Sequence, residues 1–126
     1  MRQPDSEVLE KAVAEACRRA HAEVLEFTVA PRKHGDGHDW LIEFVEPPRA
    51  PELFPRALDE ALARRHEDYR DARWIEGTIA PPRVIELPAG TFQRYGGRVP
   101  AWSEDRVLAD ELLAVAASSP VPLLVS

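Results

Sequence analysis

The chain has 126 residues, of which 44% are hydrophobic, and a net charge of −6 at pH 7. A domain of this size buries about two thirds of its unfolded surface, so one core can form without disulfides or metals. The acidic charge argues against nucleic acid and anionic membrane surfaces as partners. No apolar run is long enough to span a bilayer, and the N-terminus is acidic where a signal peptide would be basic, so we expect a cytoplasmic protein.

The first predicted element is a helix that ends near residue 22. Asp5 or Ser6 is the expected N-cap, because either side chain can accept a hydrogen bond from the first free N–H groups. Apolar residues then recur at steps of three and four, which predicts one buried stripe. The single cysteine, Cys17, lies in this stripe. A buried thiol is therefore favoured over a nucleophile or a metal ligand.

Two strands follow, over residues 24–30 and 40–46, where apolar and polar residues alternate. A long hairpin loop joins them. His34, Asp36 and His38 share this loop, and two histidines with a carboxylate are a potential metal set. A glycine-containing loop with no fourth ligand nearby in sequence is more typical of a polar connection. We therefore predict no metal site.

The second half of the chain predicts a long helix over residues 51–73, a third strand over 83–87 and a last helix that begins with Ser103 as its cap. This order favours one α+β domain over residues 1–126, a two-layer sandwich with the helices packed on one face of a small antiparallel or mixed sheet. It corresponds to a ferredoxin-like unit with the first strand missing. Of the tryptophans, Trp40 is expected in the core, whereas Trp74 and Trp102 flank loops where they could meet a partner.

The missing strand has a consequence for assembly. In a ferredoxin-like sheet it would lie in the middle, so its loss would leave N–H and C=O groups of its neighbours unpaired. The apolar tail, residues 118–126, is the best candidate in the sequence for an added strand. It would either fold back within the chain or reach a second copy, and a homodimer through the tail or an exposed strand edge would be symmetric.

Several short motifs, taken together in their order and spacing, resemble one known family. They are Gly37-His38-Asp39-Trp40-Leu41-Ile42-Glu43, Leu58-Asp59-Glu60-Ala61-Leu62, His66-Glu67-Asp68-Tyr69, Pro82-Arg83-Val84, Pro88-Ala89-Gly90-Thr91-Phe92 and Val99-Pro100. From the first helix to about Asp110, the chain resembles the C-terminal domain of the auxin-responsive Gretchen Hagen family of acyl-acid amido synthetases. The resemblance implies an adenylate-forming enzyme, in which a large N-terminal domain binds ATP and a carboxylic acid. The small C-terminal domain swings over the active site for amide formation.

The resemblance also implies where the site lies. Family members carry a lysine immediately before the Val-Pro of a loop, and this chain has Arg98 there. A guanidinium can fork onto a phosphate or a carboxylate, but its shape and charge distribution differ from those of an ammonium. Arg98 is therefore the catalytic candidate. The candidates for contact with an anion or a partner are Arg94, Tyr95, Gly96, Gly97, Val99 and Trp102.

No Ser/Thr/Gly-rich phosphate loop or other nucleotide-binding signature is present in the sequence. We therefore expect the chain to bind no cofactor by itself, and ATP and Mg²⁺ to enter only through an adenylating partner domain, in cis or in trans. The first hypothesis is a catalytically incomplete module that docks to such a domain. Two alternatives remain. The chain completes an amide-forming active site in trans, with Arg98 and Arg94 contacting the adenylate or the amine, or it is a degenerate interaction or assembly protein.

Overall fold

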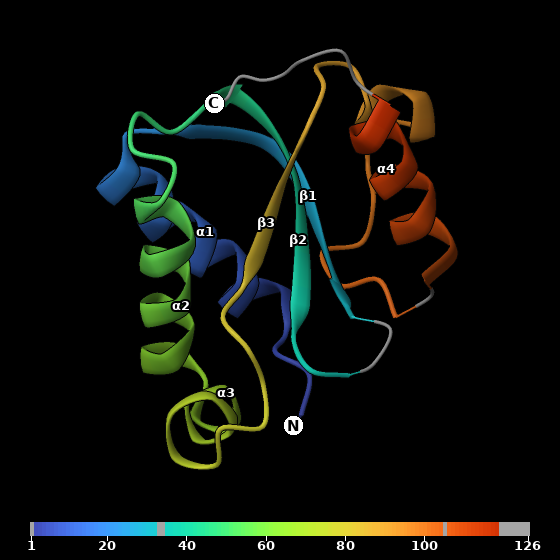
Figure 1. Ribbon diagram of the computed structural model, residues 1–126. Helices are drawn as coiled ribbons and strands as arrows, with labels where there is room; N and C mark the ends of the chain where they lie inside the picture. Colours follow the sequence, from blue (N-terminus) through green and yellow to red (C-terminus); the bar gives the residue numbers. More distant parts are fainter. Residues whose placement is uncertain (1, 33–34, 105, 119–126) are drawn as a thin grey trace.

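The computed structural model describes residues 2–32, 35–104 and 106–118 (Figure 1). Its elements are, in chain order, α1 (Ser6–Ala20), β1 (Glu23–Pro31), β2 (His38–Glu46), α2 (Leu53–Arg65), α3 (Glu67–Arg70), the π-helical turn η1 (Asp71–Ile75), β3 (Arg83–Leu87), the 3-10 turn η2 (Phe92–Tyr95) and α4 (Arg106–Ser118). Within the described ranges, no helix is long and apolar enough to cross a membrane.

The sheet is mixed, with the strands in the order β1-β2-β3. β1 pairs with β2 in antiparallel fashion, and β2 pairs with β3 in parallel fashion. The prediction of a gap in the middle of the sheet is therefore wrong, because β3 pairs directly with β2, from Asp39↔Arg83 to Glu43↔Leu87. The tail that was expected to fill the gap lies, from residue 119 on, outside the described residues.

Helices cover both faces of this sheet (Figure 1). α1 and α2 pack on the face to which Trp40 and Ile42 belong, and α4 packs on the face of Leu41 and Leu87. The α+β class with a small mixed sheet is confirmed, but the expectation that all helices share one face needs correction. The reason why both faces are covered lies in β2, where Trp40, Leu41 and Ile42 are consecutive and all buried. Successive side chains of a strand point to opposite faces, so both faces had to be covered.

The predicted helix over residues 51–73 is divided at His66. The backbone of His66 is extended, at φ −141° and ψ 108°, and its ring nitrogen Nδ1 accepts a hydrogen bond from the Tyr69 N–H at 3.2 Å. The side chain thus caps a new helix, α3. The Tyr69 hydroxyl then donates to buried Asp59 of α2, which also accepts two N–H groups of Arg73. Burial and this hydrogen bond raise the pKa of Tyr69.

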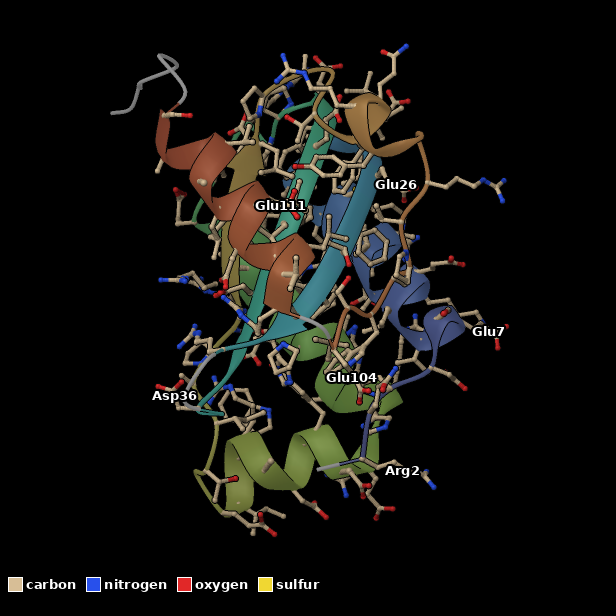
Figure 2. The ribbon with its side chains drawn as sticks, turned by 90° about the vertical axis from the view of Figure 1, so that its right-hand side faces the viewer. Arg2, Glu7, Glu26, Asp36, Glu104 and Glu111 are labelled. Atoms are coloured by element: carbon tan, nitrogen blue, oxygen red, sulfur yellow. The ribbon has the colours of Figure 1, made fainter. Side chains whose placement is uncertain are left out.

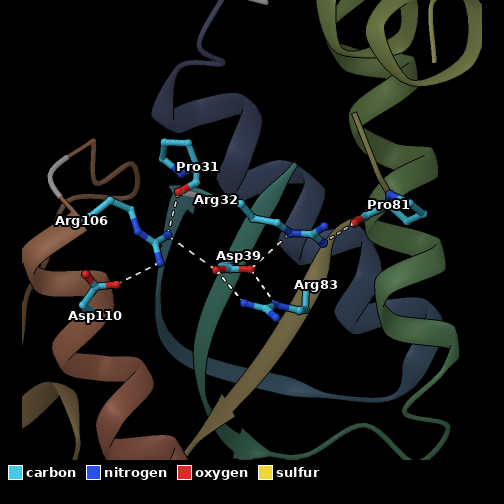
Figure 3. A network of polar contacts seen from close by, with 7 residues as sticks. All are labelled: Pro31, Arg32, Asp39, Pro81, Arg83, Arg106 and Asp110. Atoms are coloured by element: carbon cyan, nitrogen blue, oxygen red, sulfur yellow. Dashed lines mark hydrogen bonds and ion pairs between the residues drawn. The ribbon is translucent and has the colours of Figure 1, made fainter. Parts of the chain in front are cut away.

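A buried carboxylate joins α4 to the sheet (Figure 3). Asp39 of β2 is 1% exposed and accepts two N–H groups of Arg83, at 2.8 and 3.0 Å. The guanidinium nitrogens of Arg32 and Arg106 lie 3.5 and 3.6 Å from its oxygens. Arg106, in the first turn of α4, also donates to the Pro31 carbonyl at 2.7 Å. One anion therefore ties the ends of β1 and β3 and the start of α4 together.

The Asp39 network should be essential for stability. Asp39→Asn removes the negative charge and leaves three guanidinium groups facing a neutral amide, which should lower the free energy of unfolding by about 3 kcal/mol in urea titrations. The matched control is Asp110→Asn, because Asp110 also pairs with Arg106 but its side chain is 45% exposed. That change should cost less than about 1 kcal/mol. Equal effects of the two substitutions would contradict the role assigned to Asp39.

Candidate functional site

The loop singled out in the sequence joins η2 to α4, and a buried glutamate holds its first end. Glu43 of β2 is 3% exposed. Its two carboxylate oxygens accept the N–H of Gly90 at 2.6 Å and the N–H of Phe92 at 3.0 Å. Carboxylates are favourable at such positions because the N–H groups at the start of a helical turn have no partner within the turn. Glu43 therefore fixes where η2 begins and in which direction the loop leaves.

A buried threonine of β1 holds the second end. The Thr28 hydroxyl donates to the Pro100 carbonyl at 2.7 Å and lies 2.6 Å from the Ser103 hydroxyl. Because Thr28 has one proton to donate, Ser103 must donate to Thr28 in this pair. The backbone then pairs with the outer edge of β1, since Val29 receives the N–H of Ser103 and donates its own to Ala101. The sequence predicted that Ser103 caps the last helix. This prediction is wrong, because α4 begins at Arg106 and the Ser103 hydroxyl faces the sheet.

Between these two anchors the loop is open to solvent. Gly96 and Gly97 have φ values of 87° and 82°, and this left-handed region strains residues with a side chain. Arg94 and Arg98 are exposed on either side of the glycine pair. The loop therefore presents two guanidinium groups from a backbone that is fixed at both ends.

Two other predicted contact residues face inward. The Tyr95 hydroxyl donates to Glu111 of α4 at 3.4 Å, and Val99 packs against the apolar cluster between the sheet and α4. α4, with Glu111, lies across the sheet in Figure 2. These two side chains support the loop from below, whereas Arg94, Gly96, Gly97 and Arg98 form its outer surface.

Trp102 also turns into the protein. Its ring meets the ring of His38 edge-on, with 5.2 Å between the centroids. Of the two tryptophans expected near partners, Trp74 is the exposed one, at 55%, and it stacks against Arg73. Sequence position beside a loop did not distinguish the two, because the inward turn of Trp102 depends on its pairing with β1.

His38 is a buried titratable group at the start of β2. It is 9% exposed, and burial, followed by the positive charge of Arg32, lowers its pKa from 6.5 to about 4. Asp36 is exposed and His34 lies outside the described residues. Among the residues that the structure describes, no three His, Cys, Asp or Glu side chains gather in a way that would hold a metal ion.

A family model and two solved structures with which the chain was compared carry the same family name. The family model described as the GH3 family C-terminal domain matches residues 7–99. The solved structures of GH3.15 acyl acid amido synthetase and of AtGH3.15 acyl acid amido synthetase in complex with 2,4-DB resemble the chain with TM-scores of 0.69 and 0.71. Each is 17% identical and matches 91% of this chain, but only 25% and 24% of its own. At this identity the likeness shows a shared fold, and the chain spans about a quarter of those proteins.

A curated relative has a different name. A stretch of 85 residues is 33% identical to the 1,4-alpha-glucan branching enzyme GlgB of Pseudomonas aeruginosa. The match covers 61% of this chain and 11% of that protein. It therefore concerns a small part of the relative, and the activity in its name belongs to the whole protein.

The Glu43 anchor can be tested by removing one acceptor. In Glu43→Gln the amide offers one oxygen, so either Gly90 or Phe92 loses the acceptor of its buried N–H, at a cost of about 1–3 kcal/mol. Amide hydrogen exchange should accelerate at these two residues, and urea unfolding should show the loss of stability. Glu46→Gln is the control, because Glu46 lies on the same strand and is exposed. Unchanged exchange at Gly90 and Phe92 would disprove the anchor.

His38 should make stability depend on pH. Its pKa is lower in the folded state, about 4, than the ordinary 6.5, so the unfolded chain binds the proton more readily. The stability that neutral His38 provides is therefore complete above pH 6.5 and is lost as the pH falls towards 4, by about 3 kcal/mol at most. The free energy of unfolding should be measured by urea titration at a series of pH values. Above pH 6.5 it should change with pH in the same way in the wild type and in His38→Gln, and below pH 6.5 it should fall more steeply in the wild type. Parallel profiles from pH 7.5 to 4 would contradict this assignment.

Proposed function

We propose, from the premise that the chain belongs to the GH3 family as a C-terminal domain, that it is a catalytically incomplete module that docks against an adenylating domain. That domain lies in the same polypeptide or on another chain. Docking would bring the loop between η2 and α4 to the adenylating domain. We place this role in the cytoplasm, where ATP is available.

The observation that carries the proposal is the construction of the loop. Glu43 fixes one end and Thr28 the other, both from buried positions on the sheet. The exposed part between them carries Arg94 and Arg98. The two buried polar anchors fix the orientation of the loop's backbone, which is what a loop that approaches a second domain in one orientation requires.

Arg98 is the residue that we expect to act on a bound anion. The N–H groups of Gly96 and Gly97 already donate to the Gln93 and Phe92 carbonyls, at 3.2 and 2.9 Å. The positively charged donors of the exposed part of the loop are the guanidinium groups of Arg94 and Arg98. A guanidinium binds a phosphate or carboxylate with two parallel N–H donors, and it stabilises negative charge most strongly where docking excludes water.

ATP and Mg²⁺ would be bound by the adenylating domain, as the family resemblance implies. The part played by this chain is confined to its own residues. It would close over the bound acyl adenylate, exclude water and place the Arg98 side chain near the negative charge. Amide formation is the activity in the names of the similar solved structures. For this chain it is a proposal.

The similarity to the branching enzyme favours a second candidate function. A related stretch there makes up a small part of a protein named for a different chemistry. A domain that accompanies different catalytic functions is typical of an interaction or assembly module. In that case the domain would bind a partner without contributing a residue to any reaction.

Reconstitution distinguishes the two candidates. The purified chain, ATP, Mg²⁺, an acyl acid and an amino acid should release no pyrophosphate. Amide formation should begin when a GH3 acyl acid amido synthetase deprived of its own C-terminal domain is added. Arg98→Ala should then reduce the rate about 10- to 100-fold, which is the value of one charge-assisted hydrogen bond.

The control is Arg56→Ala, because Arg56 is also exposed but lies on α2, against the other face of the sheet. It should leave the rate unchanged. Turnover by the chain alone would contradict an incomplete module. A fully active Arg98→Ala pair would remove the loop from catalysis and favour the interaction module.

A further inference from the structure

One edge of the sheet, along β3, is left open by the described part of the chain. β3 is the last strand in the order β1-β2-β3. Alternate backbone groups of a strand point to opposite sides, so some N–H and C=O groups of β3 point away from β2. Among the described residues, the backbone of residues 83–87 makes no hydrogen bond beyond its pairing with β2. In Figure 1, β3 lies in front of the other two strands, and no described helix or strand lies in front of it.

The opposite edge of the sheet has a partial cover. On β1, Val29 exchanges two backbone hydrogen bonds with Ala101 and Ser103, which follow the Arg98 loop. β3 has no such neighbour among the described residues, although Val84 and Ile85 in its middle are apolar and only half-buried. An open edge with apolar residues is a template for pairing with another strand. The edge of β3 is therefore the place where the sheet can be extended.

α4 carries the chain along β3 from one end to the other. Its first residue, Arg106, contacts Asp39, where the pairing of β2 with β3 begins. Towards its last turn, Ala116 packs against the cluster that includes Leu87, at the end of β3. In Figure 2, α4 also rises towards the side of the sheet on which β3 lies. The chain beyond Ser118 therefore starts near the end of β3, and on turning back it would run antiparallel to this strand.

The sequence after α4 has the composition of a strand that is covered on both faces. It reads Ser119-Pro120-Val121-Pro122-Leu123-Leu124-Val125-Ser126. Pro120 cannot continue the helix and suits a turn. Residues 121–125 are all apolar or proline and carry no charge, and they equal β3 in length. Because helices cover both faces of the sheet, a fourth strand beside β3 needs apolar side chains at consecutive positions, which this segment provides.

We propose that residues 121–125 of the same chain add a fourth strand to the open edge of β3, antiparallel to it. The tail is the occupant because α4 brings it to this edge in the required direction, and residues 119–120 suffice for the turn, since connections between neighbouring elements are usually this short. The added strand covers Val84 and Ile85 and closes the edge against other chains. This edge lies apart from the Arg98 loop, and the proposal does not depend on the function of that loop.

Pro122 determines which residues of the added strand bond to β3. Proline has no N–H, so an edge strand tolerates it where that position points to solvent. In an antiparallel pair, alternate residues direct both their N–H and their C=O to the partner. Residues 122 and 124 are therefore the outward ones, and residues 121, 123 and 125 bond to β3. The two neighbouring leucines, Leu123 and Leu124, must then differ in their tolerance of proline.

A pair of proline variants tests this difference in the full chain. Leu123→Pro removes an N–H that donates to β3, whereas Leu124→Pro removes one that points to solvent. Hydrogen exchange of the amides of residues 84–87, followed by NMR, is the readout. Leu123→Pro should accelerate the exchange of the outward amides of β3 about tenfold or more, and Leu124→Pro by less than about twofold. Leu123→Ala retains the N–H and controls for the lost side chain, so its effect should be the smaller of the two changes at this position.

Removal of the whole segment provides a second test. A chain that ends at Ser118 should show exchange in β3 at least as fast as that of Leu123→Pro, and sedimentation should show that the full chain is a monomer. Three results would overturn the proposal. They are equal effects of the two proline variants, exchange in β3 that the truncation leaves unchanged, and a dimer of the full chain that the truncation dissociates, which would place the tail on a second copy.

Discussion

A buried charge must be paired, and β2 carries two buried carboxylates on the face that α4 covers. Asp39 and Glu43 are both almost fully buried, and neither finds its partners within its own strand. Asp39 takes guanidinium groups from β3, from the end of β1 and from α4, whereas Glu43 takes backbone N–H groups from the turn before η2. Leaving either carboxylate without these partners would cost several kcal/mol. The final third of the chain is therefore obliged to return to this face and to cross it in one direction.

The site and the fold thus share the same interactions. Glu43 is buried and supports the fold, yet it also fixes the start of the loop between η2 and α4, which carries Arg98. Thr28 has the same double character at the other end, through Pro100 and Ser103. The candidate site is exposed and carries its charge on flexible side chains, while everything that orients its backbone is inside the protein. Rigid support beneath mobile side chains is how a loop can combine reach with a defined orientation.

Periodicity in the sequence located the main helices and strands but not the break at His66, and the family motifs led to the loop. The partners of the buried polar groups could not be predicted from local periodicity. Asp39 and Arg106, for example, are 67 positions apart, and no local spacing connects them. Two misplacements have the same origin. Ser103 was expected to cap the last helix, and one unbroken helix was expected where His66 divides it. The roles of both residues depend on which hydroxyl or backbone N–H lies nearby in space. One signal was readable and was missed, namely the consecutive apolar residues Trp40, Leu41 and Ile42, which require a cover on both faces.

The position of α4 in the sequence also affects how the protein folds during its synthesis on the ribosome. Synthesis proceeds from the N-terminus, so α1, α2 and the complete sheet emerge before any residue of α4. During that interval Leu41 and Leu87 are uncovered, and Asp39 has only its partners from the β1 end and β3. The nascent sheet thus exposes an apolar surface that chaperones recognise. The family match ends at residue 99, before α4 begins at Arg106, so an expression fragment cut at the family boundary would remain permanently in this unfinished state.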